Sequence, residues 1–343
     1  MNGPRGEIDR ALAGGAIVIT NSVVGALLAV AAAGPIRPVH TYSIVARDPA
    51  TGELGVAVQS HYFSVGPIVP WAESGVGAVA TQSLVLVDYG PGGLDLMRQG
   101  ATAREALDSL LRADSNPAVR QVAIVDARGG VAVHTGAKCI PEAGHHAGEG
   151  YSVQANLMAK PTVWPAMAKA YENASGNLAE RMMQALEAAE REGGDIRGRQ
   201  SAAMVVVRAK PSGKPWADRT VDLRVEDHPE PLKELRRLLQ LKRAYLAADS
   251  GDVALAAGHA EEARAAYAMA AALAPGVVEL QFWAALSMYT GGSETEGRAL
   301  FRKVFAKEKR WVPLVRRLAT VGLFPDDEAK IRDVLAQAPG GER

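Results

Sequence analysis

The sequence predicts an α+β domain followed by an all-α domain, on three observations. Residues 41–47 and 54–59 are apolar, strand-like runs joined by the turn DPATGE, which indicates a β-hairpin. Further strand-like runs alternate with amphipathic helical stretches as far as residue 225. Beyond residue 232 the chain is Ala-rich and helical, and it repeats a pattern at a fixed offset.

About eight strands are expected in the first domain. After the hairpin they cover residues 76–82, 121–125, 131–135, 151–155, 201–208 and 220–225. Helices are expected at residues 93–112, 163–171 and 178–192. Because the helices stand between pairs of hairpins, the order argues against βαβ units. It favours antiparallel sheets with helices packed outside.

The helical domain follows the Pro-rich break DHPEPL, residues 227–232. The motif GHAEEARAAY begins at Gly258 and GSETEGRALF begins at Gly292, an offset of 34 residues that also aligns Tyr267 with Phe301. This is the period of the tetratricopeptide repeat, whose helix pairs bury their apolar faces only against neighbours. Two units are expected, at residues 238–275 and 276–310, with a capping helix at residues 312–321. The alternative is accidental similarity between Ala-rich helices.

Composition excludes several classes of protein. The chain has 343 residues, and its 38 Lys and Arg residues equal its 38 Asp and Glu residues, so no basic surplus favours nucleic acid. Its one cysteine, Cys139, excludes an intramolecular disulfide and a four-cysteine zinc site. Cys139, Glu142, His145, His146 and Glu149 match no zinc spacing, and no phosphate-binding loop is present. Neither a metal nor a cofactor is therefore expected.

The first forty residues read as a leader. Residues 11–33 are almost wholly apolar and end in small residues, which is typical of a secretory signal and predicts export to the periplasm or the extracellular space. The run is also long enough for an uncleaved membrane anchor. A wrongly assigned start codon is the third alternative.

Four stretches carry a family resemblance. The hairpin TYSIVARDPATGELGVAVQSH, with GVGAVATQS, GEGYSVQANLM and GGDIRGRQSAAMVVV, closely resembles the Ntn-hydrolase-like family catalogued as domain of unknown function 1028. The resemblance covers residues 41–228. It implies a four-layer αββα sandwich, whereas periodicity alone predicts only an α+β fold. It implies little about the substrate.

Thr41 opens the first strand and is the expected nucleophile. A hydroxyl needs a base, and in the amino-terminal nucleophile strategy that base is the residue's own α-amine, whose pKa is about 7.7–8.0. Thr41 must then be the first residue, yet forty residues precede it, and the better small-residue cleavage site lies at residues 31–33. The alternative is a β-branched residue that simply begins a strand.

Two amides at strand ends are expected beside it. Gln82 precedes a Gly-rich helix start and is our expected donor to an oxyanion, although a plain turn explains it equally well. Asn156, in QANLM, either polarises a carbonyl or caps the next helix. Gln82 and Asn156 join Thr41 as expected catalytic residues.

The expected substrate-binding residues come from two segments. The loop GGDIRGRQS concentrates polar side chains between a helix and a strand, where a guanidinium is able to clamp a carboxylate, although solvated charges at a helix terminus are more common. The end of the second strand adds a serine and a histidine, the latter an alternative base. The residues are Ser60, His61, Asp195, Arg197, Arg199, Gln200 and Ser201.

Two functions remain open from the sequence. The first is an exported amidohydrolase that cleaves a small molecule or peptide through Thr41, with residues 41–228 as the hydrolase-like domain. The second is a catalytically silent protein that binds a ligand or a partner, with the repeats of residues 232–325 as the docking surface. Residues 326–343 are expected to be a tail. No nucleic acid is expected as a partner, and homo-oligomerisation stays open.

Overall fold

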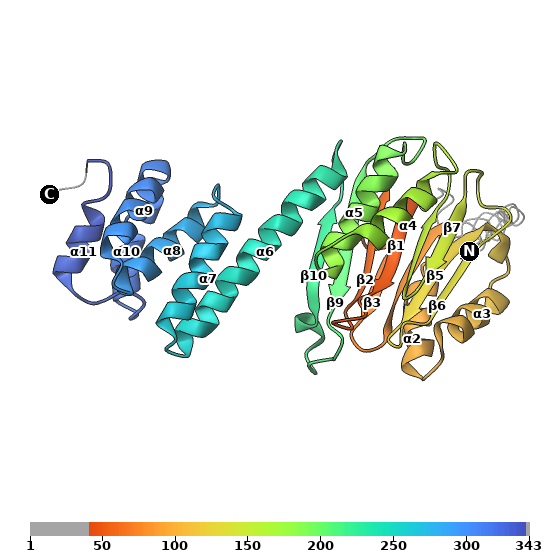
Figure 1. Cartoon of the computed structure of the whole chain (residues 1–343), viewed down its shortest axis with the longest axis horizontal. Helices are drawn as coiled ribbons and strands as arrows, with labels where there is room; N and C mark the ends of the chain where they lie inside the picture. Colours follow the sequence, from red (N-terminus) through yellow and green to blue (C-terminus); the bar gives the residue numbers. More distant parts are fainter. Residues whose placement is uncertain (1–40, 341–343) are drawn as a thin grey trace, which may run out of the picture.

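A computed structural model describes residues 41–340. The part before residue 226 contains two antiparallel sheets with helices on their outer faces, and the part after it is helical (Figure 1). The predicted mixed α+β class is confirmed. The predicted leader or anchor at residues 1–40 lies outside the described residues.

Six strands form the larger sheet, in the order β10-β9-β2-β1-β8-β7. Their bounds are β1 Thr41–Arg47, β2 Leu54–Ser60, β7 Gly144–Gly148, β8 Tyr151–Ala155, β9 Ser201–Val207 and β10 Arg219–Val225. The predicted hairpin is present as β1 and β2. Its turn is closed by the carboxylate of Asp48, which accepts from the backbone N–H groups of Ala50 and Thr51, and by Gly52 at φ 73°.

The smaller sheet has four strands in the order β3-β4-β5-β6. They are β3 Pro70–Glu73, β4 Gly77–Ser83, β5 Arg120–Asp126 and β6 Val131–Thr135. The sequence prediction missed β3 and β7, which are edge strands of their sheets. β3 has four residues, and β7 is the largely exposed GHHAG, so neither carries the alternating apolar pattern of a half-buried strand.

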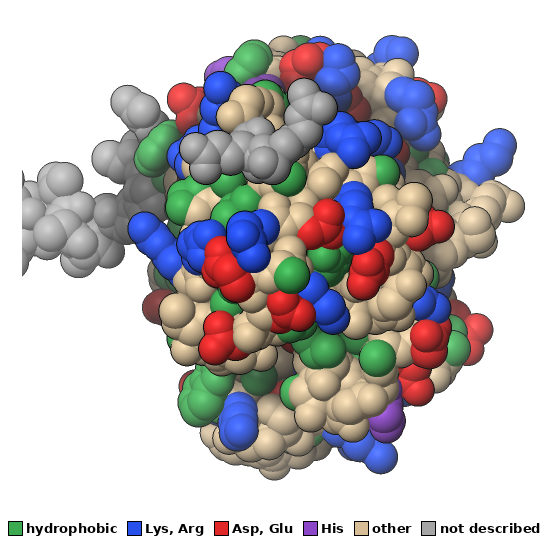
Figure 2. All heavy atoms as spheres, turned by 90° about the vertical axis from the view of Figure 1, so that its left-hand side faces the viewer, with side chains coloured by type: hydrophobic (Ala, Val, Ile, Leu, Met, Phe, Trp, Pro, Cys, Tyr) green, Lys and Arg blue, Asp and Glu red, His purple; other side chains and the backbone are tan. Residues whose placement is uncertain are grey.

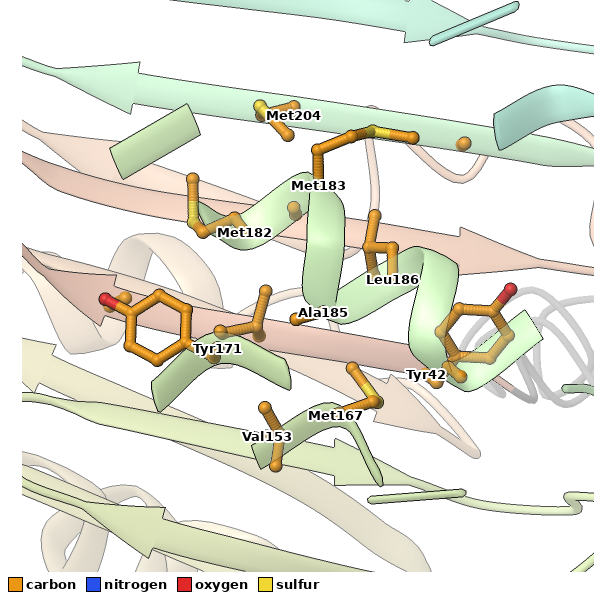
Figure 3. Close-up of a cluster of buried hydrophobic side chains, with 14 of the residues drawn as sticks. Tyr42, Val153, Met167, Tyr171, Met182, Met183, Ala185, Leu186 and Met204 are labelled. Atoms are coloured by element: carbon orange, nitrogen blue, oxygen red, sulfur yellow. The ribbon is translucent and has the colours of Figure 1, made fainter. Parts of the chain in front are cut away.

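The layers follow from the alternation of side chains along the strands. On β1, Tyr42 and Ile44 pack against α4 Val163–Asn173 and α5 Leu178–Arg191, while Val45 faces the other sheet. Figure 3 shows Met182, Met183 and Leu186 of α5 lying over the strands of the larger sheet. Helices α2 Tyr89–Arg98 and α3 Ala103–Ala113 cover the outer face of the smaller sheet. The layers therefore run helices, sheet, sheet, helices.

The single helix predicted at residues 93–112 is wrong, because α2 and α3 are separate helices. Gly100 adopts φ 103°, which ends the first helix. Two residues later Thr102 begins the second with a capping box, in which its hydroxyl accepts from Glu105 N and the Glu105 carboxylate accepts from Thr102 N. Both helices place apolar residues at helical spacing toward the sheet, so the sequence pattern resembles that of one longer helix.

Helix α6, Pro231–Ala256, joins the two parts of the protein. Leu232, Leu235 and Leu239, in its first turns, complete the core between α5 and the larger sheet. Its later residues, including Ala244 and Ala248, belong to the core of the C-terminal helices. One continuous helix therefore fixes both parts, and the Pro-rich break at residues 227–232 marks its start rather than a linker.

The remaining helices are α7 Ala260–Leu273, α8 Val278–Thr290, α9 Glu294–Lys307, α10 Leu314–Ala319 and α11 Glu328–Leu335. α11 lies within the residues expected to form a tail, and it packs through Ile331 and Val334 into the core of α8 and α9. Tyr267 and Phe301, which the repeat offset aligns, are both buried. Each sits in the second helix of a pair.

The two helix pairs turn in the same way. Gly258 and Gly292 both have positive φ, at 79° and 91°. The next residue donates from its N–H to the carbonyl five positions back, from His259 to Ala254 and from Ser293 to Met288. These are the same left-handed cap at the same offset, which explains why glycine recurs there.

The surface formed by the C-terminal helices carries acidic and basic side chains side by side, with hydrophobic ones between them (Figure 2). This matches the zero formal net charge of the chain. Between residues 41 and 340, none of the helices has both the length and the apolar character needed to cross a bilayer.

Phe301→Ala is expected to lower the free energy of unfolding of the helical part by about 3–5 kcal/mol, because it opens a cavity between buried rings. Denaturant titration followed by helical circular dichroism measures it. Met269→Ala, at a side chain that is 60% exposed on α7, is the matched control and should have little effect. Equal stability of the two variants would contradict the packing described.

Candidate functional site

Thr41 is the first residue of β1 and lies buried opposite Ser60, the last residue of β2. Its hydroxyl donates to Ser60 Oγ over 3.1 Å. The N–H of Asn156, just past the end of β8, donates to the Thr41 carbonyl over 3.1 Å. Three strand ends therefore meet at the residue expected to be the nucleophile.

Two side-chain amides also hold the carbonyl of Thr41. Gln82 Nε2 reaches it from β4 of the opposite sheet over 3.2 Å, and Asn156 Nδ2 lies 3.5 Å from it. The expected convergence of Gln82 on Thr41 is therefore present in the structure. The amides position the Thr41 backbone, and their expected part in binding an oxyanion stays a prediction.

The amides belong to a buried network that crosses from sheet to sheet. Gln121 Oε1, on β5, accepts from Gln82 Nε2 at 2.7 Å and from Asn156 Nδ2 at 2.9 Å. Ser43 donates to Gln82 Oε1 and accepts from Gln154 Nε2, both at 2.6 Å. All these side chains are fully buried. The inter-sheet layer is thus polar near Thr41 and apolar farther along the strands.

Sequence reasoning missed Ser43, Gln121 and Gln154. Their positions along the strands could have identified them. Val45, two residues after Ser43, and Ala123, two residues after Gln121, face the other sheet, so the polar residues face it too. A polar residue at an inward position of an alternating strand is costly unless it is hydrogen-bonded. Such residues are therefore expected to hydrogen-bond to one another in a buried network.

Asp195 anchors the loop at residues 193–201. Its carboxylate is buried and accepts from Arg197 N at 2.9 Å, Arg197 Nε at 3.0 Å and Arg197 Nη2 at 2.6 Å. It also accepts from the backbone N–H of His61 at 3.2 Å. The loop is therefore bound to the end of β2, one residue from Ser60.

The other loop residues are also held by protein groups. Arg199 pairs with Glu190 at 2.9 Å, and its carbonyl lies 3.4 Å from His61 Nδ1. Gln200 Nε2 donates to Asp227 at 3.2 Å. Ser201 Oγ donates to the Tyr62 carbonyl and accepts from Val65 N. The structure brings this loop to the Thr41 end of the sheet, with both guanidinium groups already paired to carboxylates.

Tyr42 ties the outer helix layer to the same place. Its hydroxyl donates to Glu190 Oε2 over 2.7 Å, and Glu190 also holds Arg199. Burial, and then the neighbouring Glu190 carboxylate, raise the pKa of Tyr42 well above its ordinary value. The phenol is therefore a fixed donor that holds α5 against the start of β1.

Backbone strain gathers at these strand ends. Ser64, Ser83 and Leu157 have φ of 57°, 72° and 57°, in the left-handed region that residues other than glycine seldom adopt. Ser83 and Leu157 directly follow Gln82 and Asn156. Such conformations cost about 1–3 kcal/mol each and tend to cluster at functional sites. They give a reason, independent of residue chemistry, to place the site here.

The histidine-rich segment near Cys139 shows no metal arrangement: within residues 41–340, no three His, Cys, Asp or Glu side chains are grouped to hold an ion. Burial raises the pKa of the Cys139 thiol, whose Sγ lies 3.3 Å from the Arg120 carbonyl. Burial and the nearby His134 and His146 lower the pKa of His145.

Comparisons with known proteins identify the family of the sheet part. The family described as "Family of unknown function (DUF1028)" matches residues 41–235. A protein of the same family from Silicibacter pomeroyi has a crystal structure; its sequence is 30% identical to this chain, and the two structures superpose with a TM-score of 0.53. The alignment covers 59% of this chain and 85% of that one. No curated protein matches the chain.

Gln121→Leu is expected to destabilise the sheet part by at least about 2 kcal/mol. It removes the acceptor of two buried amides, and each buried donor left unsatisfied costs about 1–3 kcal/mol. Denaturant unfolding of the full chain measures the change.

Gln59→Leu is the matched control, since Gln59 is equally buried but its amide atoms have no hydrogen-bond partner within residues 41–340. That variant should be neutral or more stable than the natural chain. Equal losses at both positions would show that the network contributes nothing beyond packing.

Proposed function

The chain belongs to the DUF1028 family of unknown function, and we propose that it hydrolyses an amide bond with the hydroxyl of Thr41. The observation that carries the proposal is the placement of Thr41. It opens a central strand, its hydroxyl contacts Ser60, and its carbonyl is held by amide groups from both sheets. The layer order and the resemblance of the hairpin support an Ntn-hydrolase-like sandwich.

In the proposed reaction the Thr41 α-amine takes the hydroxyl proton as Oγ1 attacks the substrate carbonyl. An acyl ester forms on Thr41, the amine of the substrate leaves with a proton, and water then cleaves the ester. Ser60 orients the hydroxyl before attack. The substrate is a small molecule or a peptide. Gln82 is our proposed oxyanion donor, and the loop from Asp195 to Ser201 is the proposed substrate contact.

The α-amine exists only after the His40–Thr41 bond is cut, because a peptide nitrogen does not accept a proton. We therefore include this cleavage in the proposal. Export through the leader at residues 1–40 belongs to it as well. The two similar helix pairs, with their equivalent glycine caps, support a tetratricopeptide-like C-terminal region.

A second function, a ligand- or partner-binding protein without catalysis, is favoured by one specific observation. The side chains of Gln82, Asn156, Arg197 and Arg199 are all engaged by groups of the protein itself. Side chains whose hydrogen-bonding groups are already used within the protein stabilise the fold, and this role does not require catalysis. The mature amino terminus distinguishes the two functions.

A chain that begins at Thr41 is expected to hydrolyse members of an amide panel, whereas one that begins at Gly34 should be inactive. Activity should rise as the pH passes about 7.7–8.0, because the α-amine must be neutral to accept a proton. Thr41→Ser should keep part of the turnover and Thr41→Ala should lose it. Thr51→Ala, in the exposed turn of the same hairpin, is the control.

Equal activity of the two chains would make the free amine irrelevant and would move the search for a base to His61. Inactivity of both, with a ligand still bound, would support the binding protein instead. Mass-spectrometric sequencing of the mature amino terminus provides the independent check.

A further inference from the structure

The C-terminal helices enclose a groove of about 920 Å³. One wall is the second half of α6, the other is α8, and the turn at residues 322–325 closes one side. Its volume lies near the upper end of the range of about 300–1,000 Å³ typical of ligand sites. It is far along the chain from Thr41 and has no part in the proposed hydrolysis.

The charged residues that line the groove are all acidic. Asp249 and Asp252 lie one turn apart on α6, and Glu279 lies at the start of α8. Within the described residues, the lining contains no Lys, Arg or His. Within residues 41–340, no Lys, Arg or His forms an ion pair with any of the three carboxylates. In a chain whose formal net charge is zero, this groove thus gathers three acidic side chains with no basic one among its described lining.

Two tyrosines hold two of the three carboxylates in place. Tyr245 donates to Glu279 Oε2 over 2.7 Å, and Tyr267 donates to Asp252 Oδ1. Each bond occupies one oxygen, and an ionised carboxylate accepts further bonds at its second oxygen. Glu279 and Asp252 are therefore fixed in direction and still able to accept from a cation, and Asp249 lies one turn from Asp252 on α6.

The rest of the groove is apolar. Trp283, Leu280 and Phe324 contribute to its lining. Leu255 on α6 is 44% exposed, and Leu323 on the facing turn is 52% exposed. Apolar side chains of this size left in solvent beside fixed charges are typical of a surface that a partner covers.

We propose that this groove binds a peptide segment in which Lys or Arg side chains alternate with apolar ones. The three carboxylates accept from the cations, and Trp283, Leu255 and Leu323 contact the apolar residues. Nucleic acid is repelled by the same acids, and a purely apolar ligand leaves them unmatched. Because α6 continues into the sheet part, a bound segment is held at a fixed position relative to it.

Fluorescence anisotropy of the full chain tests this with three short labelled peptides, in which Leu alternates with Lys, Glu or Ser. The Lys peptide should bind, more weakly as salt is added, and the other two should bind at least about tenfold more weakly. Neutralising the groove with Asp249→Asn, Asp252→Asn and Glu279→Gln together should weaken the Lys peptide by at least about tenfold. The replacements keep an oxygen for the tyrosines.

The matched control neutralises three exposed acids elsewhere, with Asp88→Asn, Glu149→Gln and Glu262→Gln, and should leave the affinity unchanged. Thr41→Ala should also bind normally, which separates this proposal from the proposed hydrolysis. No binding of the Lys peptide, equal binding of the three peptides, or equal loss in the control would overturn the proposal. Self-association that the groove variant abolishes would identify a second copy as the occupant, and would overturn it too.

Discussion

The carbonyl of Thr41 is held between two sheets by amides from both of them, and the sandwich depends on that interaction. Two sheets that face each other must fill the space between them with apolar side chains or with polar ones that satisfy each other. Near β9 the filling is apolar. Near Thr41 it is a chain of amides in which Gln121 accepts from Gln82 and Asn156. Hydrogen bonds have direction, so the amide network fixes how the two sheets align with each other at this end of the sandwich.

The same requirement explains the surroundings of the site. Residues just beyond Gln82 and Asn156 take left-handed conformations, which are tolerated where neighbouring contacts fix the backbone. Asp195 fixes the backbone of its loop in a similar way. Its buried carboxylate needs hydrogen-bond donors, and Arg197 and the His61 N–H provide them. The site is thus held in place by groups of the protein itself. Such preorganisation is compatible with the catalysis proposed for Thr41 and equally with binding without catalysis.

Helix α6 extends the same rigidity to the C-terminal part. Its first turns belong to the core of the sheet domain and its last turns to the core of the helices. The helix runs without a break from the sheet part to the C-terminal helices (Figure 1). The acidic groove and the Thr41 end of the sheet are therefore held at a fixed position relative to each other. The two places differ in chemistry: one is a neutral network of amides, and the other presents carboxylates that no Lys or Arg pairs with in the described part of the chain, beside exposed leucines.

The sequence by itself determined the α+β class, the opening hairpin, most strands and the repeated helix pairs, because these depend on local periodicity and on turn residues such as Gly258 and Gly292. It also pointed to Thr41, Gln82 and Asn156 as polar residues at strand ends. Only the tertiary structure decided that Gln82 and Asn156 share an acceptor in Gln121, that Arg197 is paired with Asp195, and that α6 is common to both parts. The reason is physical: strand pairing and sheet packing bring together residues that are far apart along the chain, and the partner of a buried polar group depends on that packing rather than on its neighbours in sequence.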